Sequence, residues 1–172
     1  MFLNYIKNFF AKKMVKKSLE NVKPEVANES IKSVGILFDD RYFDNESALV
    51  KALVDKGIHK EQIKVLVFKA KIKKNEQFDY PVFSHQDLSW TATFDKSEVK
   101  DFIAQKFDLL INYYDDEKSG LLIVSNLSKA KFKVGFSAVD KKLNHFMIDT
   151  HAENYNIFVE ELFKYLKILN KI

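Results

Sequence analysis

The pattern of apolar and polar residues divides the chain after residue 32 into alternating strands and helices. Three short apolar runs, at residues 33–38, 63–68 and 108–113, have the near-continuous apolar character of strands that are buried on both faces of a sheet. Two further runs follow at residues 132–136 and 145–149. Strands of this kind pair in parallel and need crossover connections, which are usually helices.

Apolar residues at helical spacing lie between these strands. The predicted helices span residues 46–56, 98–106, 119–130 and 151–170. Alternation of strands and helices with short links is typical of the α/β class. The sequence therefore predicts a single Rossmann-like three-layer domain with a mostly parallel sheet, preceded by a basic N-terminal helix.

Several residues mark the expected ends of these helices. Asn45 and Ser97 are predicted N-caps, and Thr150 with Glu153 has the spacing of a capping box. Gly57 stands where a left-handed residue commonly ends a helix.

The stretch between residues 69 and 94 is less regular. Lysines alternate with apolar residues from position 69, which fits either a guarded edge strand or a surface loop over residues 69–82. A short strand is expected at residues 90–94.

The first 20 residues contain no Gly or Pro and are predicted to be helical. Apolar residues fall on one face of this helix, and a collar of lysines follows them. The apolar residues are Phe2, Leu3, Ile6, Phe9 and Phe10, and the lysines are Lys12, Lys13, Lys16 and Lys17. This order is typical of an interfacial membrane anchor, although a helix packed on the domain or on a protein partner has the same pattern. We divide the chain into a basic arm (1–23), a linker (24–32) and the α/β domain (33–172).

The positive charge of the protein is concentrated in this arm. Residues 1–23 hold six lysines against Glu20 alone, a balance of +5. Because the whole chain carries +4, the other 149 residues carry about −1. We expect the arm to bind an anionic surface, a membrane in preference to the ribosome or other RNA.

Arg41 is the only arginine, so bidentate reading of guanine is mostly unavailable and specific DNA recognition is disfavoured. The chain also has no cysteine, which excludes disulfides, thiolate catalysis and cysteine zinc sites. It lacks an apolar run of membrane-spanning length and an ordinary secretory signal. These features favour a cytoplasmic protein, peripheral on the inner face of the membrane if the arm binds lipid.

Candidate catalytic residues come from the predicted strand ends, because ligands of parallel sheets bind there. Asp39, Asp115 and Asp149, with His151, would be the residues of an enzyme that holds a divalent ion or uses paired carboxylates as acid and base. The alternative is that these aspartates are solvated helix caps, and no metal-ligand spacing supports a metal site. No glycine-rich phosphate loop is present either, so we predict no metal and no cofactor.

Residues 107–136, FDLLINYYDDEKSGLLIVSNLSKAKFKVGF, resemble the N-terminal Rossmann half of heptosyltransferase-type glycosyltransferases. The matching segments are residues 108–112, 128–131 and 133–136. Those enzymes bind their nucleotide-sugar donor with a second Rossmann domain, for which this chain has no room. The resemblance therefore implies a domain without the catalytic cleft.

The whole chain resembles a small uncharacterised family of Bacteroidetes-type bacterial proteins. The resemblance rests on the lysine-rich N-terminal segment, on GILFD at residues 35–39 and on DLLINYY at residues 108–114. It implies a bacterial cytoplasmic setting and brings no known activity. Our leading hypothesis is a non-enzymatic binding or adaptor module tethered by its arm. The alternative is an enzyme of glycosyl- or phosphoryl-group chemistry that uses the aspartate rim.

Overall fold

The computed structural model describes residues 30–41 and 46–172. The predicted arm helix, most of the predicted linker and the Asn45 cap lie outside the described residues.

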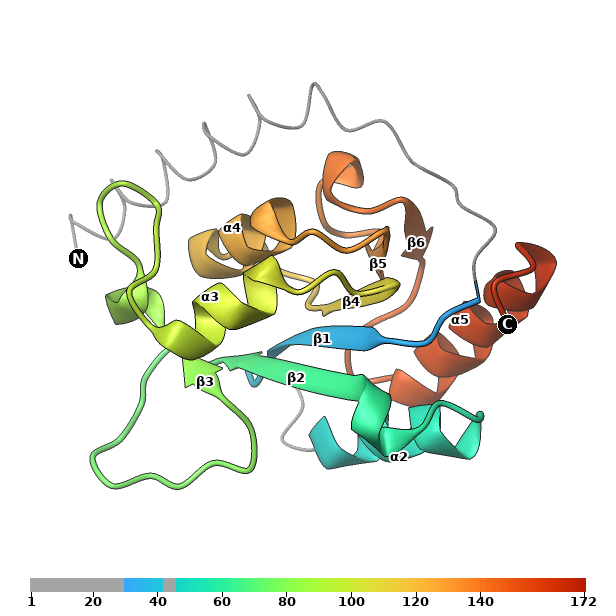
Figure 1. Cartoon of the computed structure of the whole chain (residues 1–172), viewed down its shortest axis with the longest axis horizontal. Helices are drawn as coiled ribbons and strands as arrows, with labels where there is room; N and C mark the ends of the chain where they lie inside the picture. Colours follow the sequence, from blue (N-terminus) through green and yellow to red (C-terminus); the bar gives the residue numbers. More distant parts are fainter. Residues whose placement is uncertain (1–29, 42–45) are drawn as a thin grey trace.

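The described part of the chain contains one six-stranded sheet in which every neighbouring pair of strands is parallel (Figure 1). The strand order is β3-β2-β1-β4-β5-β6. The strands are β1 (Val34–Asp39), β2 (Ile63–Phe68), β3 (Val82–Phe83), β4 (Leu109–Tyr113), β5 (Phe132–Phe136) and β6 (Phe146–Ile148). The five predicted strands at residues 33–38, 63–68, 108–113, 132–136 and 145–149 are confirmed within one residue at each end, and the sheet is wholly rather than mostly parallel.

Four described helices cover the two faces of this sheet (Figure 1). Helices α2 (Glu46–Asp55) and α5 (Tyr155–Ile168) pack together on one face. Helices α3 (Ser97–Ala104) and α4 (Ser119–Leu127) pack together on the other. This arrangement confirms a Rossmann-like three-layer domain. Successive strands are added outward from β1 to β3 on one side and from β4 to β6 on the other, so the strand order reverses between β1 and β4, the topological switch point of such sheets.

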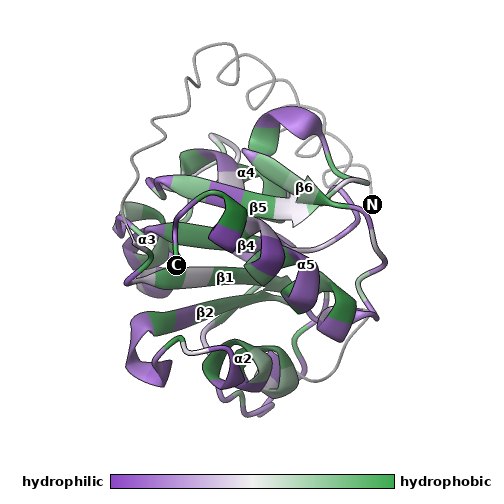
Figure 2. Cartoon of the chain, turned by 90° about the vertical axis from the view of Figure 1, so that its right-hand side faces the viewer, coloured by the Kyte–Doolittle hydropathy of each residue, from purple (hydrophilic) through white to green (hydrophobic). Residues whose placement is uncertain are grey.

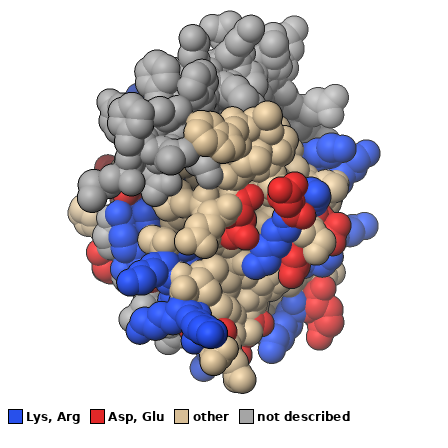
Figure 3. All heavy atoms as spheres, turned by 90° about the vertical axis from the view of Figure 1, so that its left-hand side faces the viewer, with Lys and Arg blue, Asp and Glu red and all other residues tan. Residues whose placement is uncertain are grey.

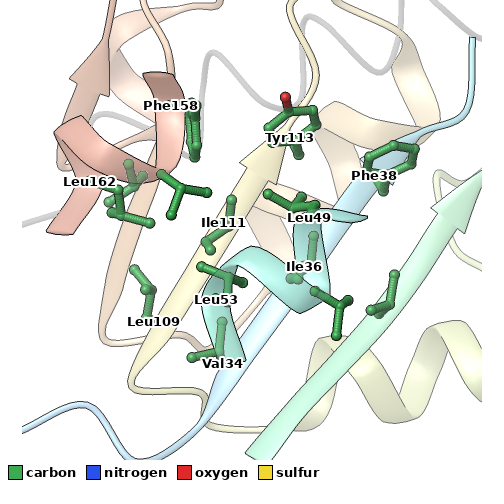
Figure 4. Packing of buried hydrophobic residues seen from close by; sticks show 14 of the residues in the cluster. Val34, Ile36, Phe38, Leu49, Leu53, Leu109, Ile111, Tyr113, Phe158 and Leu162 are labelled. Atoms are coloured by element: carbon green, nitrogen blue, oxygen red, sulfur yellow. The ribbon is translucent and has the colours of Figure 1, made fainter. Parts of the chain in front are cut away.

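The first hydrophobic core lies between the sheet and helices α2 and α5 (Figure 4). Leu49 and Leu53 of α2 and Phe158 of α5 contribute to the same cluster as Ile36 of β1 and Ile111 of β4. All are at most 1% exposed. Full burial of side chains of this size contributes about 1.5–3 kcal/mol each.

The second core lies under α3 and α4 and is rich in aromatic rings. Phe102 of α3 and Phe107 lie with their ring centroids 5.0 Å apart, and Phe68 and Phe83 meet edge to face at 5.3 Å. Apolar residues fill the strands, while polar residues face outward on the helices (Figure 2). Residues alternate between the two cores along each strand, which explains the unbroken apolar runs in the sequence.

The starts of β1 and β4 are fastened by one carboxylate. Oδ2 of Asp108 accepts hydrogen bonds at 3.0 Å from the backbone N–H of Lys32, from that of Ser33 and from the Ser33 hydroxyl. Oδ1 lies 3.1 Å from Nζ of Lys131. Burial opposes ionisation of this carboxyl, but these donors outweigh it and lower the pKa of Asp108.

Two predicted helix starts are wrong. Helix α3 begins at Ser97 itself, and the Ser97 hydroxyl donates to the Glu98 carboxylate instead of capping the helix. Helix α5 begins only at Tyr155, without a Thr150–Glu153 capping box. The carbonyl of Ala152 accepts a hydrogen bond from the Tyr113 hydroxyl, so this segment packs over the end of β4 before the helix begins.

Residues 69–81 form a loop, and only Val82–Phe83 add to the sheet edge, as β3. The predicted strand at residues 90–94 is wrong. A single antiparallel bridge between Leu88 and Phe94 closes a tight turn there, and Ala92 has a φ of 58°. Trp90 lies in this turn with 67% of its surface exposed. The prediction for Gly57 is confirmed, because the residue ends α2 with a φ of 102°.

Candidate functional site

The ends of β1 and β4 form the candidate site, because Rossmann-like sheets bind ligands outside the C-terminal ends of their strands at the switch point. The two strands are neighbours, with Phe38 in register with Tyr113. Asp39 is the last residue of β1, and residues 114–118 connect β4 to α4. Figure 3 views the molecule from this end of the strands, where side chains of both charges lie close together.

Asp39 is held by a buried ion pair. The residue is 3% exposed, and its Oδ1 and Oδ2 lie 2.8 and 2.7 Å from Nζ of Lys118. The Lys118 side chain is itself only 11% exposed, and its ammonium lies 5.0 Å from the centre of the Phe68 ring. The backbone N–H of Arg41 also donates to Oδ1 of Asp39, at 3.2 Å. Oδ1 therefore accepts two hydrogen bonds, whereas Oδ2 lies beside the Lys118 ammonium and has no hydrogen bond among the described residues.

A second ion pair lies beside the first and is more exposed. The guanidinium of Arg41 donates to Oδ2 of Asp116 at 2.6 Å and lies 3.8 Å from Oδ2 of Asp39. We call Asp39, Arg41, Asp116 and Lys118 the switch-point cluster. It contains two acidic and two basic groups and links the segment after β1 to the segment after β4. Its charges balance, and a carboxylate paired in this way is poorly placed to act as a general base.

Asp115 is the second residue after β4 and is partly buried. Among the described residues, its Oδ1 has no hydrogen-bond donor. Burial above all, and then the charge of Asp115, raises the pKa of Tyr113. Burial also raises the pKa of Tyr114, so both phenols are neutral at ordinary pH.

The structure separates Asp149 and His151 from this position. Both follow β6, which lies three strands from β1 in the sheet, a distance of about 14 Å at ordinary strand spacing. Asp149 is exposed and accepts a hydrogen bond from the Ser137 hydroxyl at 2.7 Å, and His151 is exposed as well. Thus Asp39 and Asp115 follow neighbouring strands, whereas Asp149 belongs to the far edge. Within residues 30–41 and 46–172, no three His, Asp or Glu side chains are grouped closely enough to share a metal ion.

The predicted binding residues of the arm lie outside the described residues. They are Phe2, Ile6, Phe9, Phe10, Lys12, Lys13, Lys16 and Lys17.

A buried polar network lies behind the switch point, between the sheet and α4. Nδ2 of Asn112 donates to the Ser125 hydroxyl at 2.8 Å and to Oδ1 of Asn144 at 2.7 Å. Nζ of Lys133 donates to the Ser125 carbonyl at 2.7 Å, in the last turn of α4, and burial lowers the pKa of Lys133 to about 8. A lysine at this helix end satisfies a carbonyl that has no partner within the helix. We assign the network a structural role.

Sequence reasoning missed Lys118 and the buried network. The position of Lys118 between a strand and a helix was the available signal, but nothing in the local sequence indicates that its chain turns inward to Asp39, 79 residues away. The network was missed because Asn112 and Lys133 stand inside apolar runs and are read as strand residues.

The comparisons with known proteins give a family and no activity. No curated protein matches the chain. In the described part of the chain, none of the helices has the length and apolar character needed to cross a membrane. A family model matches residues 7–169, nearly the whole sequence, and the chain therefore belongs to the family of unknown function DUF6913.

Proposed function

We propose that this protein is a non-enzymatic binding or adaptor module that its N-terminal segment attaches reversibly to an anionic surface. A single observation carries the proposal: residues 1–23 have a charge balance of +5, while the rest of the chain is nearly neutral. The family match begins at residue 7 and so spans the positions of all six lysines. Most of the basic segment therefore lies within the part of the chain that the family model covers.

The surface we favour is a membrane rather than RNA. Each lysine near an anionic membrane contributes about 1 kcal/mol, so the lysines of this segment suffice for reversible attachment. Apolar side chains at the start of the segment would add contacts with the lipid interface that RNA does not reward. We place the protein in a bacterial cytoplasm, at the inner face of the membrane.

Vesicle sedimentation tests this proposal with the full chain. Phosphatidylcholine vesicles with and without phosphatidylserine are compared, and the test variant carries Gln at Lys12, Lys13, Lys16 and Lys17. Binding should require phosphatidylserine, weaken with salt and fall at least a hundredfold in the variant, since about 1 kcal/mol per lysine corresponds to about fivefold each. The matched control carries Gln at four exposed lysines of the domain, Lys71, Lys73, Lys74 and Lys129, and should bind normally.

A fluorescent reporter distinguishes insertion from surface adsorption. Trp90 is the only tryptophan and is exposed, so Trp90→Phe should be tolerated. Adding Phe9→Trp to this variant places the sole indole in the arm. Its emission should shift to shorter wavelength with phosphatidylserine vesicles and not with an RNA homopolymer. Equal binding to RNA with no shift would contradict the membrane proposal.

An enzyme that uses the strand-end aspartates is the second candidate. The observation in its favour is that Asp39 and Asp115 follow neighbouring strands at the switch point. Against it stand the ion pair that occupies Asp39 and the distance to Asp149 and His151. The resemblance of residues 107–136 to heptosyltransferases remains a prediction. If the protein is an enzyme that uses Asp39, the Asp39→Asn variant should fold normally and lose turnover. If Asp39 has a structural role, the same variant should lose stability.

A further inference from the structure

The edge of the sheet is open beside the first half of β2. Strand β3 pairs with β2 only at Val67–Val82 and Phe68–Phe83, so within residues 30–41 and 46–172 no strand pairs with residues 63–66 on that side. In Figure 1, β3 lies beside the C-terminal end of β2. Figure 2 views the sheet from the other end of the strands, and there β2 is the outermost labelled strand.

Proline at position 81 explains why the ladder stops. The N–H of Val67 donates to the carbonyl of Pro81 at 2.9 Å, so Val67 directs its backbone groups toward β3. Val65, two residues earlier, directs its own N–H and C=O to the same edge. The next bond of a parallel ladder would run from the N–H of residue 81 to Val65, and proline has no N–H.

Three backbone groups at this edge have no hydrogen-bond partner in the part of the chain that the structure describes, and Val65 as a residue is 5% exposed. They are the N–H and C=O of Val65 and the C=O of Ile63, since the Ile63 N–H already donates to Lys60. A bare edge of this kind is a template for pairing with another chain. The available groups match what one added strand of three to four residues would use.

A groove of about 350 Å³ runs along this edge and gives the added strand a place to lie. Its floor is β2, its far wall is α3, and Tyr80 and Pro81 close one end. Glu98, Asp101, Phe102 and Gln105 of α3 line the wall. Their spacing of three, four and seven residues puts them on one helical face. The wall thus combines an aromatic ring with two exposed carboxylates.

We propose that this groove binds an extended segment of a partner protein by strand addition, and that the segment carries a lysine or arginine. The backbone groups of Val65 and Ile63 would form the ladder, and the basic side chain would face Glu98 and Asp101. No ion pair between these two carboxylates and a basic group is found among the described residues, although Glu98 accepts a hydrogen bond from the Ser97 hydroxyl. Lys64 of β2 also lines the groove, so its lining contains two acidic groups and one basic group and favours a basic side chain. The groove is distinct from the basic arm, so this proposal stands or fails independently of membrane attachment.

Amide NMR of the full chain tests the proposal without vesicles. The probe is the acetylated and amidated peptide TVKVTV. In the free protein the Val65 amide should exchange quickly with solvent, while the amide of Leu66, which faces β1, should exchange slowly. Saturation with the peptide should slow exchange at Val65 and shift its resonance. The same peptide N-methylated at every residue should leave both unchanged, because it has no backbone donors.

Variants locate the contact. Glu98→Gln with Asp101→Asn should weaken peptide binding about three- to tenfold, as expected for two exposed ion pairs. The peptide TVEVTV, which carries Glu in place of Lys, should bind the Glu98→Gln, Asp101→Asn variant more tightly than it binds the natural protein. Asp95→Asn, an exposed aspartate outside the groove, is the matched control and should bind normally. Val65→Pro removes the edge N–H and should abolish peptide binding. If the Val65→Pro variant fails to fold, the charge variants still test the proposal.

Three outcomes would overturn the proposal. The first is a Val65 amide that is already protected at every protein concentration. The second is protection that increases with protein concentration, which would identify a second copy as the occupant. The third is a Val65 resonance that does not shift at saturating TVKVTV, or an N-methylated peptide that binds as tightly as the unmodified one.

Discussion

The ammonium of Lys118 lies within 2.8 Å of both carboxylate oxygens of Asp39, at the switch point where a Rossmann-like sheet ordinarily receives its ligand. Both side chains are largely removed from solvent. The pair joins the end of β1 to the turn before α4, two segments that the more exposed Arg41–Asp116 ion pair also links. The position most suited to chemistry is thus used for a structural contact.

Asp39→Asn should therefore destabilise the protein. The substitution leaves the Lys118 ammonium enclosed without a counter-charge, and breaking a buried ion pair on one side costs about 3 kcal/mol. Urea unfolding followed by circular dichroism measures the effect, because the exposed Trp90 gives little fluorescence contrast.

Asp116→Asn is the matched control for this variant. Its ion pair with Arg41 is half-exposed, with side-chain exposures of 48% and 37%, so the loss should stay below about 1 kcal/mol. Replacing Lys118 with Met in the Asp39→Asn background should recover part of the lost stability. An Asp39→Asn protein as stable as the natural one would contradict the structural role and favour the enzyme hypothesis.

Gly135→Ala should destabilise the sheet next to the buried network. A Cβ at this position would lie 2.5 Å from Nδ2 of Asn144, which is hydrogen-bonded to Asn112 through its carbonyl oxygen and cannot move freely. Overpacking of this kind costs about 1–3 kcal/mol. Shortening the neighbour in the double variant Gly135→Ala with Asn144→Ser should relieve the clash. Equal unfolding midpoints for the single and double variants would contradict this explanation.

Lys133 should make stability rise with pH between about 8 and 10. Its pKa is about 8 in the folded protein and near 10.5 when unfolded. Below pH 8 both states bind the proton and the cost of burying the charge is fully present. As pH rises through 8 the folded state releases its proton first, so folding gains on the order of 3 kcal/mol by pH 10.5.

The comparison with Lys133→Met isolates this effect. Tyr113 and Tyr114 have raised pKa values, so their ionisation in the unfolded state opposes folding above pH 10 in both proteins. The difference in unfolding free energy between the natural protein and the variant should move in favour of the natural one as pH rises from 7 to 10. A difference independent of pH would show that Lys133 ionises normally in the fold.

Asp108 should give a dependence of the same sign in the acid range, where stability rises with pH. Its pKa is lowered in the fold, so its contribution is fully present above about pH 4 and is lost as pH falls through the folded pKa. Asp108→Asn should cost about 1–3 kcal/mol at pH 7, because charged hydrogen bonds to Ser33 and Lys131 are lost. The gap between the two proteins should narrow in acid, while Asp95→Asn should behave like the natural protein throughout.

The sequence was sufficient to predict the layers of this fold. Strands such as residues 63–68 and 132–136 are near-continuous apolar runs, interrupted by Lys64 and Lys133, because most of each strand is covered on both faces, and this property is local. The start of α5 was predicted wrongly because Ala152 is bonded to Tyr113, a contact over 39 residues that no local pattern contains. Helix capping at Ser97 failed for a similar reason, since its hydroxyl has Glu98 as a competing partner.

The candidate site was predicted only in position. The strand-end rule located Asp39 and Asp115 correctly at the switch point. It did not reveal that Lys118 fills the space beside Asp39, nor that Asp149 belongs to an edge strand, because both depend on strand order. The open edge at Val65 follows from the register in which Val67 pairs with Val82. No local sequence motif encodes that register, so the open edge could not be predicted.

The most direct test of the central claim is the distribution of the full chain in bacterial cells between soluble, membrane and ribosome fractions. The full chain is compared with a version lacking residues 1–23 and with the domain-lysine control carrying Gln at Lys71, Lys73, Lys74 and Lys129. We predict that the full chain and the control sediment with membranes and are released from them by high salt. The truncated chain should remain in the soluble fraction. A full chain that stays soluble like the truncated one, or that moves with ribosomes, would contradict the claim.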